Sequence, residues 1–112
     1  MSALVDRATT LLVLELPAAI VDLRRATVAR TDGRTERLTT LEVALLRYLA
    51  QVRGQTVSRD DLATAVWGQS AAVVSRAADV AVRRLRMKIE DDPATPAFVL
   101  TVRGVGYAFA ER

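Results

Sequence analysis

The chain has 112 residues, of which 51% are hydrophobic and 26% are charged. This length and composition are typical of one globular domain. The chain contains no cysteine and no histidine. Their absence excludes disulfides, thiolate metal sites and a Ser-His triad, and it removes the commonest general base. We therefore expect a protein that is not an enzyme and that needs no cofactor.

The net charge of +3 is concentrated in one part of the chain. Residues 75–90 hold five basic and two acidic side chains, whereas the rest of the chain holds eleven of each. A basic segment of this kind is typical of a nucleic-acid surface. The longest apolar stretch, residues 11–21, is interrupted by Glu15 and Pro17 and is too short to span a membrane. We expect a soluble, cytoplasmic protein with no membrane partner.

The first third of the chain has the pattern of short strands. We predict strands over residues 11–16, 20–24, 26–30 and 35–38. Residues 31–34 carry a hairpin signal, because the Asp32-Gly33 pair supplies the positive φ that such a turn needs.

Capping signals then predict helices. Thr39 with Glu42 forms a capping box at the start of a first helix, which Gly54 follows. After a brief extended link, Ser58 with Asp61 forms a second capping box, and Gly68 ends that short helix. We predict an uncharged loop over residues 69–74, and a third helix capped by Ser75 or a neighbour.

The third helix carries the main functional signal. Its apolar residues recur at helical spacing and predict a buried stripe of Ala78, Val82, Leu85 and Ile89. The opposite side then holds Arg76, Val80, Arg83, Arg84 and Met87, with Arg86 and Asp79 on a flank. A helix fits the major groove, where arginine contacts phosphates or guanine and valine contacts a thymine methyl group. The alternative is a solvated basic face that carries one stray valine.

A terminal β-hairpin follows the third helix. Residues 98–103 alternate, with Phe98, Leu100 and Val102 on one face, and Gly104-Val105-Gly106 makes a tight turn before a return strand. Arg103 near the tip is placed to enter a minor groove, with Thr101 and Tyr107 on nearby phosphates. The alternative is an ordinary hairpin with an exposed arginine. The single tryptophan, Trp67, packs beneath the third helix or donates its indole N–H to a phosphate.

The ordered series of these motifs resembles the OmpR/PhoB-type winged-helix DNA-binding domain, the effector domain of many two-component response regulators. The matching residues, which fall between residues 20 and 111, are Leu38-Thr39-Thr40-Leu41-Glu42, Leu45-Leu46, Gly54, Val57-Ser58-Arg59, Leu62, Val66-Trp67-Gly68, Arg76, Asp79-Val80, Arg84-Leu85-Arg86, Lys88-Ile89-Glu90, Asp92-Pro93, Pro96 and Thr101-Val102-Arg103-Gly104-Val105-Gly106-Tyr107. The resemblance implies an α+β winged helix-turn-helix with a four-stranded N-terminal antiparallel sheet, three helices and a C-terminal hairpin wing. Residues 20–112 would form the winged-helix domain, and residues 1–19 an N-terminal segment that can hold its first strand.

The resemblance also implies roles for individual residues. The third helix would be the recognition helix, with Arg84, Arg86 and Val80 at the bases. Arg103 of the wing would reach the minor groove. The residues at the phosphate backbone would be Trp67, Arg76, Arg83, Thr101, Gly104 and Tyr107. Members of the family bind direct repeats as head-to-tail pairs, and the loop after Trp67 is where members contact RNA polymerase.

The sequence departs from the family pattern at several positions. Ala81 stands where the family often has histidine, Ala77 where a polar residue is frequent, and Met87 where a basic residue is frequent. These departures predict weaker or altered sequence preference. The uncharged loop over residues 69–74 argues against a polymerase contact there. Fewer than 20 residues precede the winged-helix region, so we expect no receiver and no phosphorylation switch in this chain.

We therefore predict sequence-specific binding of double-stranded DNA in transcriptional regulation. The alternative is a winged helix that serves as a protein–protein interaction module, with the basic helix on an acidic partner.

Overall fold

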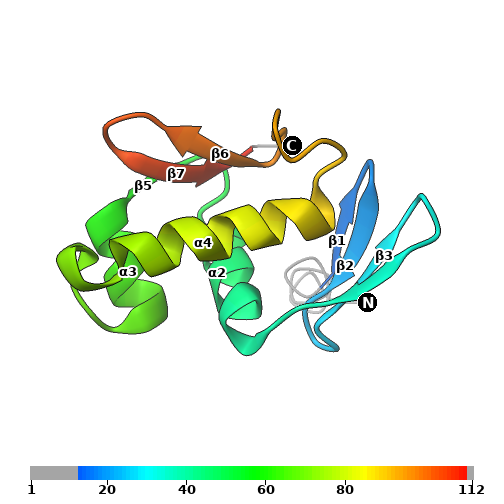
Figure 1. The fold of residues 1–112 in the computed structure, drawn as a ribbon, viewed down its shortest axis with the longest axis horizontal. Coiled ribbons are helices and arrows are strands. Elements are labelled where there is room, and N and C mark those ends of the chain that lie inside the picture. Colours follow the sequence, from blue (N-terminus) through cyan, green and yellow to red (C-terminus); the bar gives the residue numbers. More distant parts are fainter. Residues whose placement is uncertain (1–12, 111–112) are drawn as a thin grey trace, which may run out of the picture.

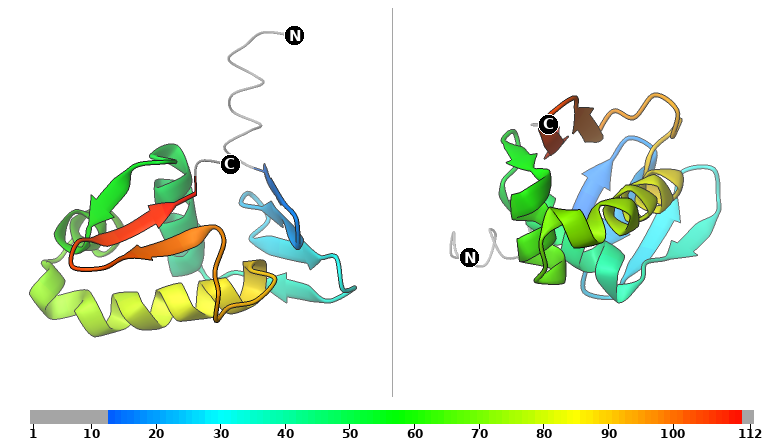
Figure 2. Two further views of the ribbon diagram at one scale, coloured as in Figure 1. Left: turned by 90° about the horizontal axis from the view of Figure 1, so that it is seen from above. Right: turned by 60° about the vertical axis from the view of Figure 1, so that its left-hand side comes forward.

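The computed structural model describes residues 13–110 as a mixed α+β fold built around one long helix (Figure 1). A four-stranded sheet lies near the C-terminal end of that helix, and a three-stranded sheet lies along its side (Figure 2). This architecture confirms the predicted winged helix-turn-helix. No helix among the described residues is long and apolar enough to cross a membrane.

The N-terminal sheet is an antiparallel meander. Its strands are β1 (Val13–Leu16), β2 (Ala19–Asp22), β3 (Thr27–Arg30) and β4 (Thr35–Arg37), paired in that order. Leu14, Val21 and Val28 lie side by side across three strands and are buried, because alternate residues of each strand face the helices. The four predicted strands are confirmed, although the predicted residues 11 and 12 lie outside the described part of the chain.

The β3–β4 turn differs from the prediction in one respect. Gly33 has a φ of +93°, but Asp32 is not among the described residues with positive φ. Asp32 instead accepts a hydrogen bond from the backbone N–H of Arg34 at 3.0 Å through its side chain. The turn is thus a glycine turn braced by an aspartate, and only one of its two central residues needs left-handed backbone.

Two helices follow with the predicted cap residues, but the capping box predicted for Ser58 and Asp61 is only half formed, because the Asp61 side chain accepts no bond from the Ser58 backbone N–H. Helix α2 (Thr40–Gln51) begins with the complete capping box of Thr39 and Glu42. Helix α3 (Arg59–Trp67) begins at Ser58, whose side chain accepts from the N–H of Asp61, and ends at Gly68 in left-handed conformation. Their apolar faces, with Leu45 and Leu62, belong to one common core.

The third helix begins earlier than predicted. Helix α4 (Ala71–Ile89) starts after Ser70, so the predicted loop over residues 69–74 and the predicted cap near Ser75 are wrong. The reason is that Val74 is buried and extends the apolar stripe one turn before Ala78, which draws residues 71–74 into the helix. The rest of the stripe is confirmed, since Ala78, Val82, Leu85 and Ile89 are all buried.

The wing is a hairpin with an additional strand. Strands β6 (Val99–Val102) and β7 (Gly106–Phe109) pair antiparallel, and β5 (Thr56–Ser58) pairs with β7 on the other side. The hairpin is confirmed, but β5 was predicted only as an extended link. Val99, on the same side as Thr101, is the fully buried residue of β6. Gly106 is required because a Cβ atom there would overlap the carbonyl oxygen of Val57.

Candidate nucleic-acid interface

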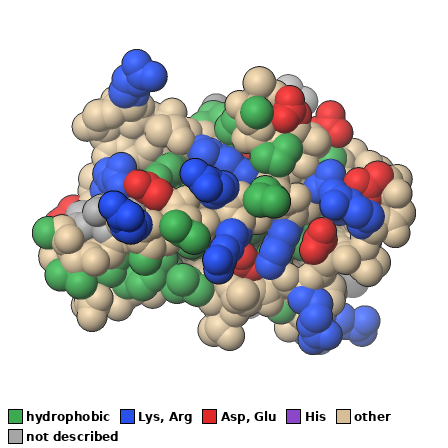
Figure 3. Space-filling view, in the orientation of Figure 1, with side chains coloured by type: hydrophobic (Ala, Val, Ile, Leu, Met, Phe, Trp, Pro, Cys, Tyr) green, Lys and Arg blue, Asp and Glu red, His purple; other side chains and the backbone are tan. Residues whose placement is uncertain are grey.

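Helix α4 presents one basic, solvent-exposed side. Arg76, Arg83 and Arg84 are exposed, and within the described part of the chain no hydrogen bond or ion pair engages them. The space-filling view shows blue arginine and lysine side chains along this face, with green apolar side chains between them (Figure 3). The predicted orientation of the helix is therefore confirmed, and these guanidinium groups are available to an external anion.

The exposed side divides into two rows at helical spacing. The first row lies toward the wing and holds Arg76, Asp79, Arg83 and Arg86. The second row, which we call the outer row, lies toward the start of α2 and holds Val73, Ala77, Val80, Arg84 and Met87. An open groove runs between the outer row and the first turn of α2, where Leu41 lines it. One row is thus mainly charged and the other mainly apolar.

Arg86 is bound to the wing. Its Nε donates to the carbonyl oxygen of Val99 at 2.8 Å, and its Nη2 donates to Oγ1 of Thr101 at 2.7 Å. Two of the side chains predicted to contact DNA are therefore brought together, and they contact each other. Arg86 keeps other N–H groups free of these two bonds, so its predicted base contact stays a prediction.

A second polar cluster ties α4 to α3 and β7. Asp79 Oδ1 accepts from the Tyr107 hydroxyl at 2.6 Å and from Arg59 Nη2 at 2.9 Å. The hydrogen bond from Tyr107, with a further contribution from Arg59, holds the pKa of the Asp79 carboxyl below its usual value. Burial, followed by the nearby Asp79 carboxylate, raises the pKa of Tyr107 to about 12.

Tyr107 lies differently from the other predicted phosphate contacts. It is only 5% exposed, and its single hydroxyl proton is donated to Asp79. The hydroxyl cannot donate to a phosphate while it makes this bond. Its geometry favours a role in holding the wing against α4, and its predicted phosphate contact remains untested.

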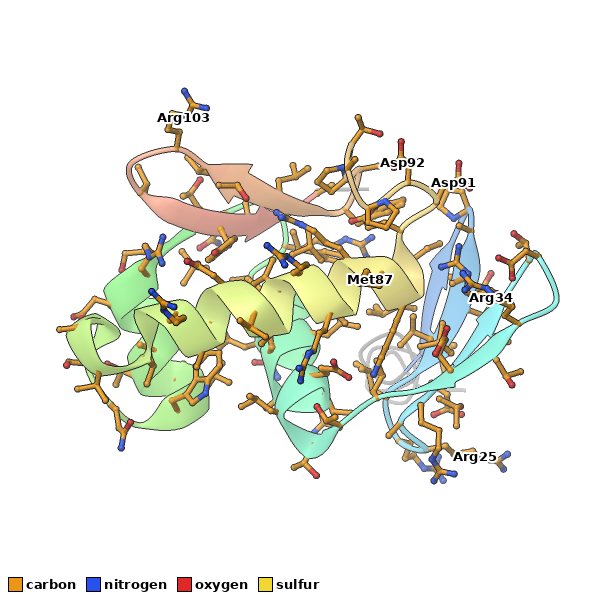
Figure 4. The ribbon with its side chains drawn as sticks, viewed as in Figure 1. Arg25, Arg34, Met87, Asp91, Asp92 and Arg103 are labelled. Atoms are coloured by element: carbon orange, nitrogen blue, oxygen red, sulfur yellow. The ribbon has the colours of Figure 1, made fainter. Side chains whose placement is uncertain are left out.

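The tip of the wing is exposed and apart from the body of the molecule. Arg103 points outward from the β6–β7 turn (Figure 4). Gly104 beside it has a φ of +79°. This conformation suits glycine and leaves the backbone at the tip unobstructed. Trp67, at the end of α3, is half-buried and packs against the core.

The C-terminal end of α4 is held by side chains for which no sequence pattern predicts such a role. Arg30 Nη1 donates to the carbonyl oxygens of Lys88 and Glu90, at 2.9 and 3.2 Å. Lys88 Nζ lies 2.7 Å from Glu42 Oε1 and donates to the carbonyl oxygen of Arg37 at 2.7 Å. These bonds fix the helix to β3, β4 and α2. Arg30 and Lys88 satisfy terminal carbonyl groups or a buried carboxylate, so they are not free for DNA.

Glu90 is the most buried charged residue of the described chain. Its carboxylate accepts from the backbone N–H groups of Ala97, Phe98 and Val99, at 2.8 to 3.0 Å. It therefore fixes the point at which the chain enters the wing. A helix end locked in this way sets the direction of both α4 and β6.

The geometry defines a class of protein. A helix with a free basic side, a preceding helix joined by a short turn, and an adjacent hairpin with an arginine at its tip form a winged helix-turn-helix. Comparison with known proteins identifies the family. Residues 33–109 match the family model described as "Transcriptional regulatory protein, C terminal". The chain belongs to this family of OmpR/PhoB-type effector domains, which is a class of DNA-binding transcriptional regulators and not a class of enzymes.

Relatives and solved structures agree with this assignment. Over 91 residues the chain is 42% identical to the probable transcriptional regulator ycf27 of Porphyridium aerugineum, covering 80% of this chain and 38% of that protein. The RstA DNA-binding domain of Klebsiella pneumoniae, solved in complex with the RstA box, is 31% identical with a TM-score of 0.71, over 89% of this chain and 98% of that one. The Thermotoga maritima response regulator DrrB, an OmpR/PhoB homologue, is 29% identical with a TM-score of 0.73, over 96% of this chain and 51% of that one.

Proposed function

We propose that the chain binds double-stranded DNA sequence-specifically in the cytoplasm and thereby regulates transcription, with α4 in the major groove and the wing in the minor groove. The proposal rests on the unbonded guanidinium groups of Arg76, Arg83 and Arg84 on the exposed side of α4. They lie next to a hairpin with Arg103 at its tip. A convex basic surface of this kind complements the phosphate-lined groove of a duplex. The similarity to the RstA domain, which was solved in complex with the RstA box, supports the binding of DNA.

The proposed contacts fall into three groups. Base contacts come from Arg84, Val80 and Arg86, the last through the N–H groups that the wing leaves unused. Arg103 enters the minor groove. The residues at the phosphates are Trp67, Arg76, Arg83, Thr101, Gly104 and Tyr107, of which Tyr107 would have to leave Asp79 to donate. Arginine is suited to both tasks because its planar fork matches guanine edges and phosphate oxygens.

Further partners belong to the same proposal. Head-to-tail pairing on direct repeats would place two copies of α4 in successive major grooves on one side of the duplex. RNA polymerase is the second partner that the family resemblance implies; its contact would be the exposed α3–α4 turn over residues 68–70, and the lack of charge in this turn still argues against a strong contact. The match with the curated relative covers 38% of that protein's length.

Selection from a random duplex library, followed by footprinting, tests the proposal. We expect one enriched site, protection in adjacent major and minor grooves, and an affinity that falls linearly with salt on logarithmic axes. Failure to bind random duplex DNA at low salt would overturn it. That result would favour the alternative, in which the exposed side of α4 contacts a protein.

A further inference from the structure

The outer row of α4 exposes apolar side chains to an unusual degree. Val73 is 69% exposed, Val80 is 41% exposed and Met87 is 57% exposed. They recur every three or four residues together with exposed Ala77, so all of them lie along one line of the helix. Arg84 is the only hydrogen-bonding side chain in the row. A single exposed valine is ordinary, but an exposed line of apolar groups indicates a surface that a partner covers.

Charged groups beside the outer row indicate what this partner is. Arg76 and Arg83 flank the row on its wing side and have no partner among the described residues, whereas Asp79 between them is bonded to Arg59 and Tyr107. Glu42, the acidic group nearest the groove, is buried and bonded to Lys88. A polyanion is therefore complementary to the charged edge of the row. The part of that polyanion that faces the row itself must be apolar. The thymine-bearing edge of the major groove meets both conditions, because each thymine presents a methyl group there.

We infer that the outer row contacts thymine methyl groups, so that the target half-site holds one guanine, bound by Arg84, with thymines on both sides. This inference rests on the proposed function. Val80 lies about 6 Å before Arg84 along the helix axis, and Met87 lies about 4.5 Å after it. These offsets correspond to about one or two base pairs on each side of the guanine. Ala77 and Met87, which replace frequent polar residues of the family, then change the preference from hydrogen bonding to methyl contact.

Deoxyuridine tests the inference directly, because it differs from thymidine only by the missing methyl group. The selected duplex is synthesised with deoxyuridine at one thymine position at a time, and each affinity is measured by fluorescence anisotropy. We expect a loss of about fourfold at each thymine beneath the outer row and no loss elsewhere, since burial of one methyl group has roughly that effect. Replacement of the same thymine by cytosine weakens binding more, and 5-methylcytosine restores part of it.

Variants locate the contact on the protein. Val80→Ala is expected to bind the thymidine duplex more weakly and to become insensitive to deoxyuridine at one position. Met87→Ala is expected to show the same two effects, with the insensitive position on the other side of the guanine. Ile20→Ala is the matched control, because Ile20 is a similarly exposed apolar residue on β2 of the N-terminal sheet. It should keep the affinity and the full deoxyuridine effect. All three side chains are exposed, so the variants are expected to fold.

The outcomes separate this inference from the proposed function. If the chain binds a selected, salt-sensitive site but deoxyuridine is tolerated at every position, the methyl contact is overturned and DNA binding stands. If Val80→Ala and Ile20→Ala respond alike, the outer row is not the contacting surface, which also overturns the inference. If no duplex binds at low salt, the proposed function itself fails and the outer row covers a protein partner instead.

Discussion

The open side of α4 and its C-terminal end are built differently although both carry charged side chains. On the open side, Arg76, Arg83 and Arg84 extend into solvent without a bond to any described residue. At the C-terminal end, Glu90 is buried, and Arg30, whose side chain is 6% exposed, donates to two carbonyl oxygens of the helix. The open side is available to an external partner, whereas the end is fixed by internal hydrogen bonds.

This difference shows that the burial of a charged group and its bonds decide its role. Arg30 and Arg83 have the same side chain, yet Arg30 donates to Lys88, Glu90 and Asp32, whereas Arg83 makes no hydrogen bond with any described residue. A fixed C-terminal end sets the direction of the open side of the helix, much as a rigid scaffold supports a binding site. We therefore expect substitutions at the fixed end to change stability, and substitutions on the open side to change DNA affinity alone.

The largest effect is expected at the fixed end, for Glu90→Ala. This variant leaves three backbone N–H groups without their acceptor, one of them buried and two part-buried, and we expect it to lower the free energy of unfolding by about 3–5 kcal/mol. Urea denaturation followed by circular dichroism measures the change. Glu15→Ala, on the exposed side of β1, is the matched control and should change stability by less than about 0.5 kcal/mol. Equal effects of the two variants would contradict the comparison.

The next effect is expected on the open side of α4, for Arg84→Ala. We expect it to weaken binding to the selected site by about 1–3 kcal/mol and to relax the preference at one base pair, with unfolding unchanged. Arg83→Ala is the matched variant, one position away. It should weaken binding to all sequences similarly and reduce the salt slope by about one. Anisotropy titrations at several salt concentrations distinguish them, and an unchanged base preference after Arg84→Ala would reject the assignment.

The sequence predicts local features of the fold well, because their causes lie within a few residues. The Thr39 capping box, the Gly68 stop and the buried stripe of α4 each depend on neighbours three or four positions apart. The start of α4 was misplaced because both Ser70 and Ser75 are acceptable cap residues in the sequence. Only the burial of Val74 decides between them, and burial is a property of the packed molecule.

Contacts between distant segments could not be predicted. Asp79 and Tyr107 are 28 positions apart, and Arg30 and Glu90 are 60 apart, so no local spacing indicates either bond. The sequence identified which side of α4 faces outward, and hence Arg76, Arg83 and Arg84 as candidates. It did not show that Arg86 is bound to the wing, because that bond depends on how β6 returns along the helix.

A smaller effect is expected for Tyr107→Phe, which removes the bond between the wing and Asp79. At neutral pH we expect a loss of about 1 kcal/mol in unfolding free energy, since one hydrogen bond to a carboxylate is removed. A double-mutant cycle with Asp79→Asn isolates the pair. If the two changes are additive, the Tyr107–Asp79 bond contributes nothing, and the wing is held to α4 by the Arg86 bonds and by packing.

The pH dependence of the same variant follows from the two pKa shifts. Folding raises the pKa of Tyr107 from 10.0 to about 12, so its stabilisation is complete below pH 10 and is lost as pH rises towards 12. The gap between the wild type and Tyr107→Phe should therefore narrow over this range. The lowered pKa of Asp79 acts in the opposite direction, because its stabilisation is present above pH 3.8 and is lost at lower pH. Urea unfolding at both extremes measures these changes.

The smallest effect is expected for Arg103→Ala at the tip of the wing. Arg103 makes no hydrogen bond or ion pair with any other described residue, so the variant should unfold like the wild type. Its binding should weaken by no more than about 1 kcal/mol, and only where the minor groove beside the site is narrow and A·T-rich, because a narrow groove has the stronger negative potential. Affinities for duplexes with A·T-rich and G·C-rich flanks measure this difference.

Arg25→Ala, in the β2–β3 turn far from the wing, is the matched control (Figure 4). If Arg25→Ala and Arg103→Ala lower the affinity equally for both flanks, Arg103 contributes only general charge. A loss confined to Arg103→Ala and to the A·T-rich flank would show that the DNA-binding surface includes the wing as well as the open side of α4.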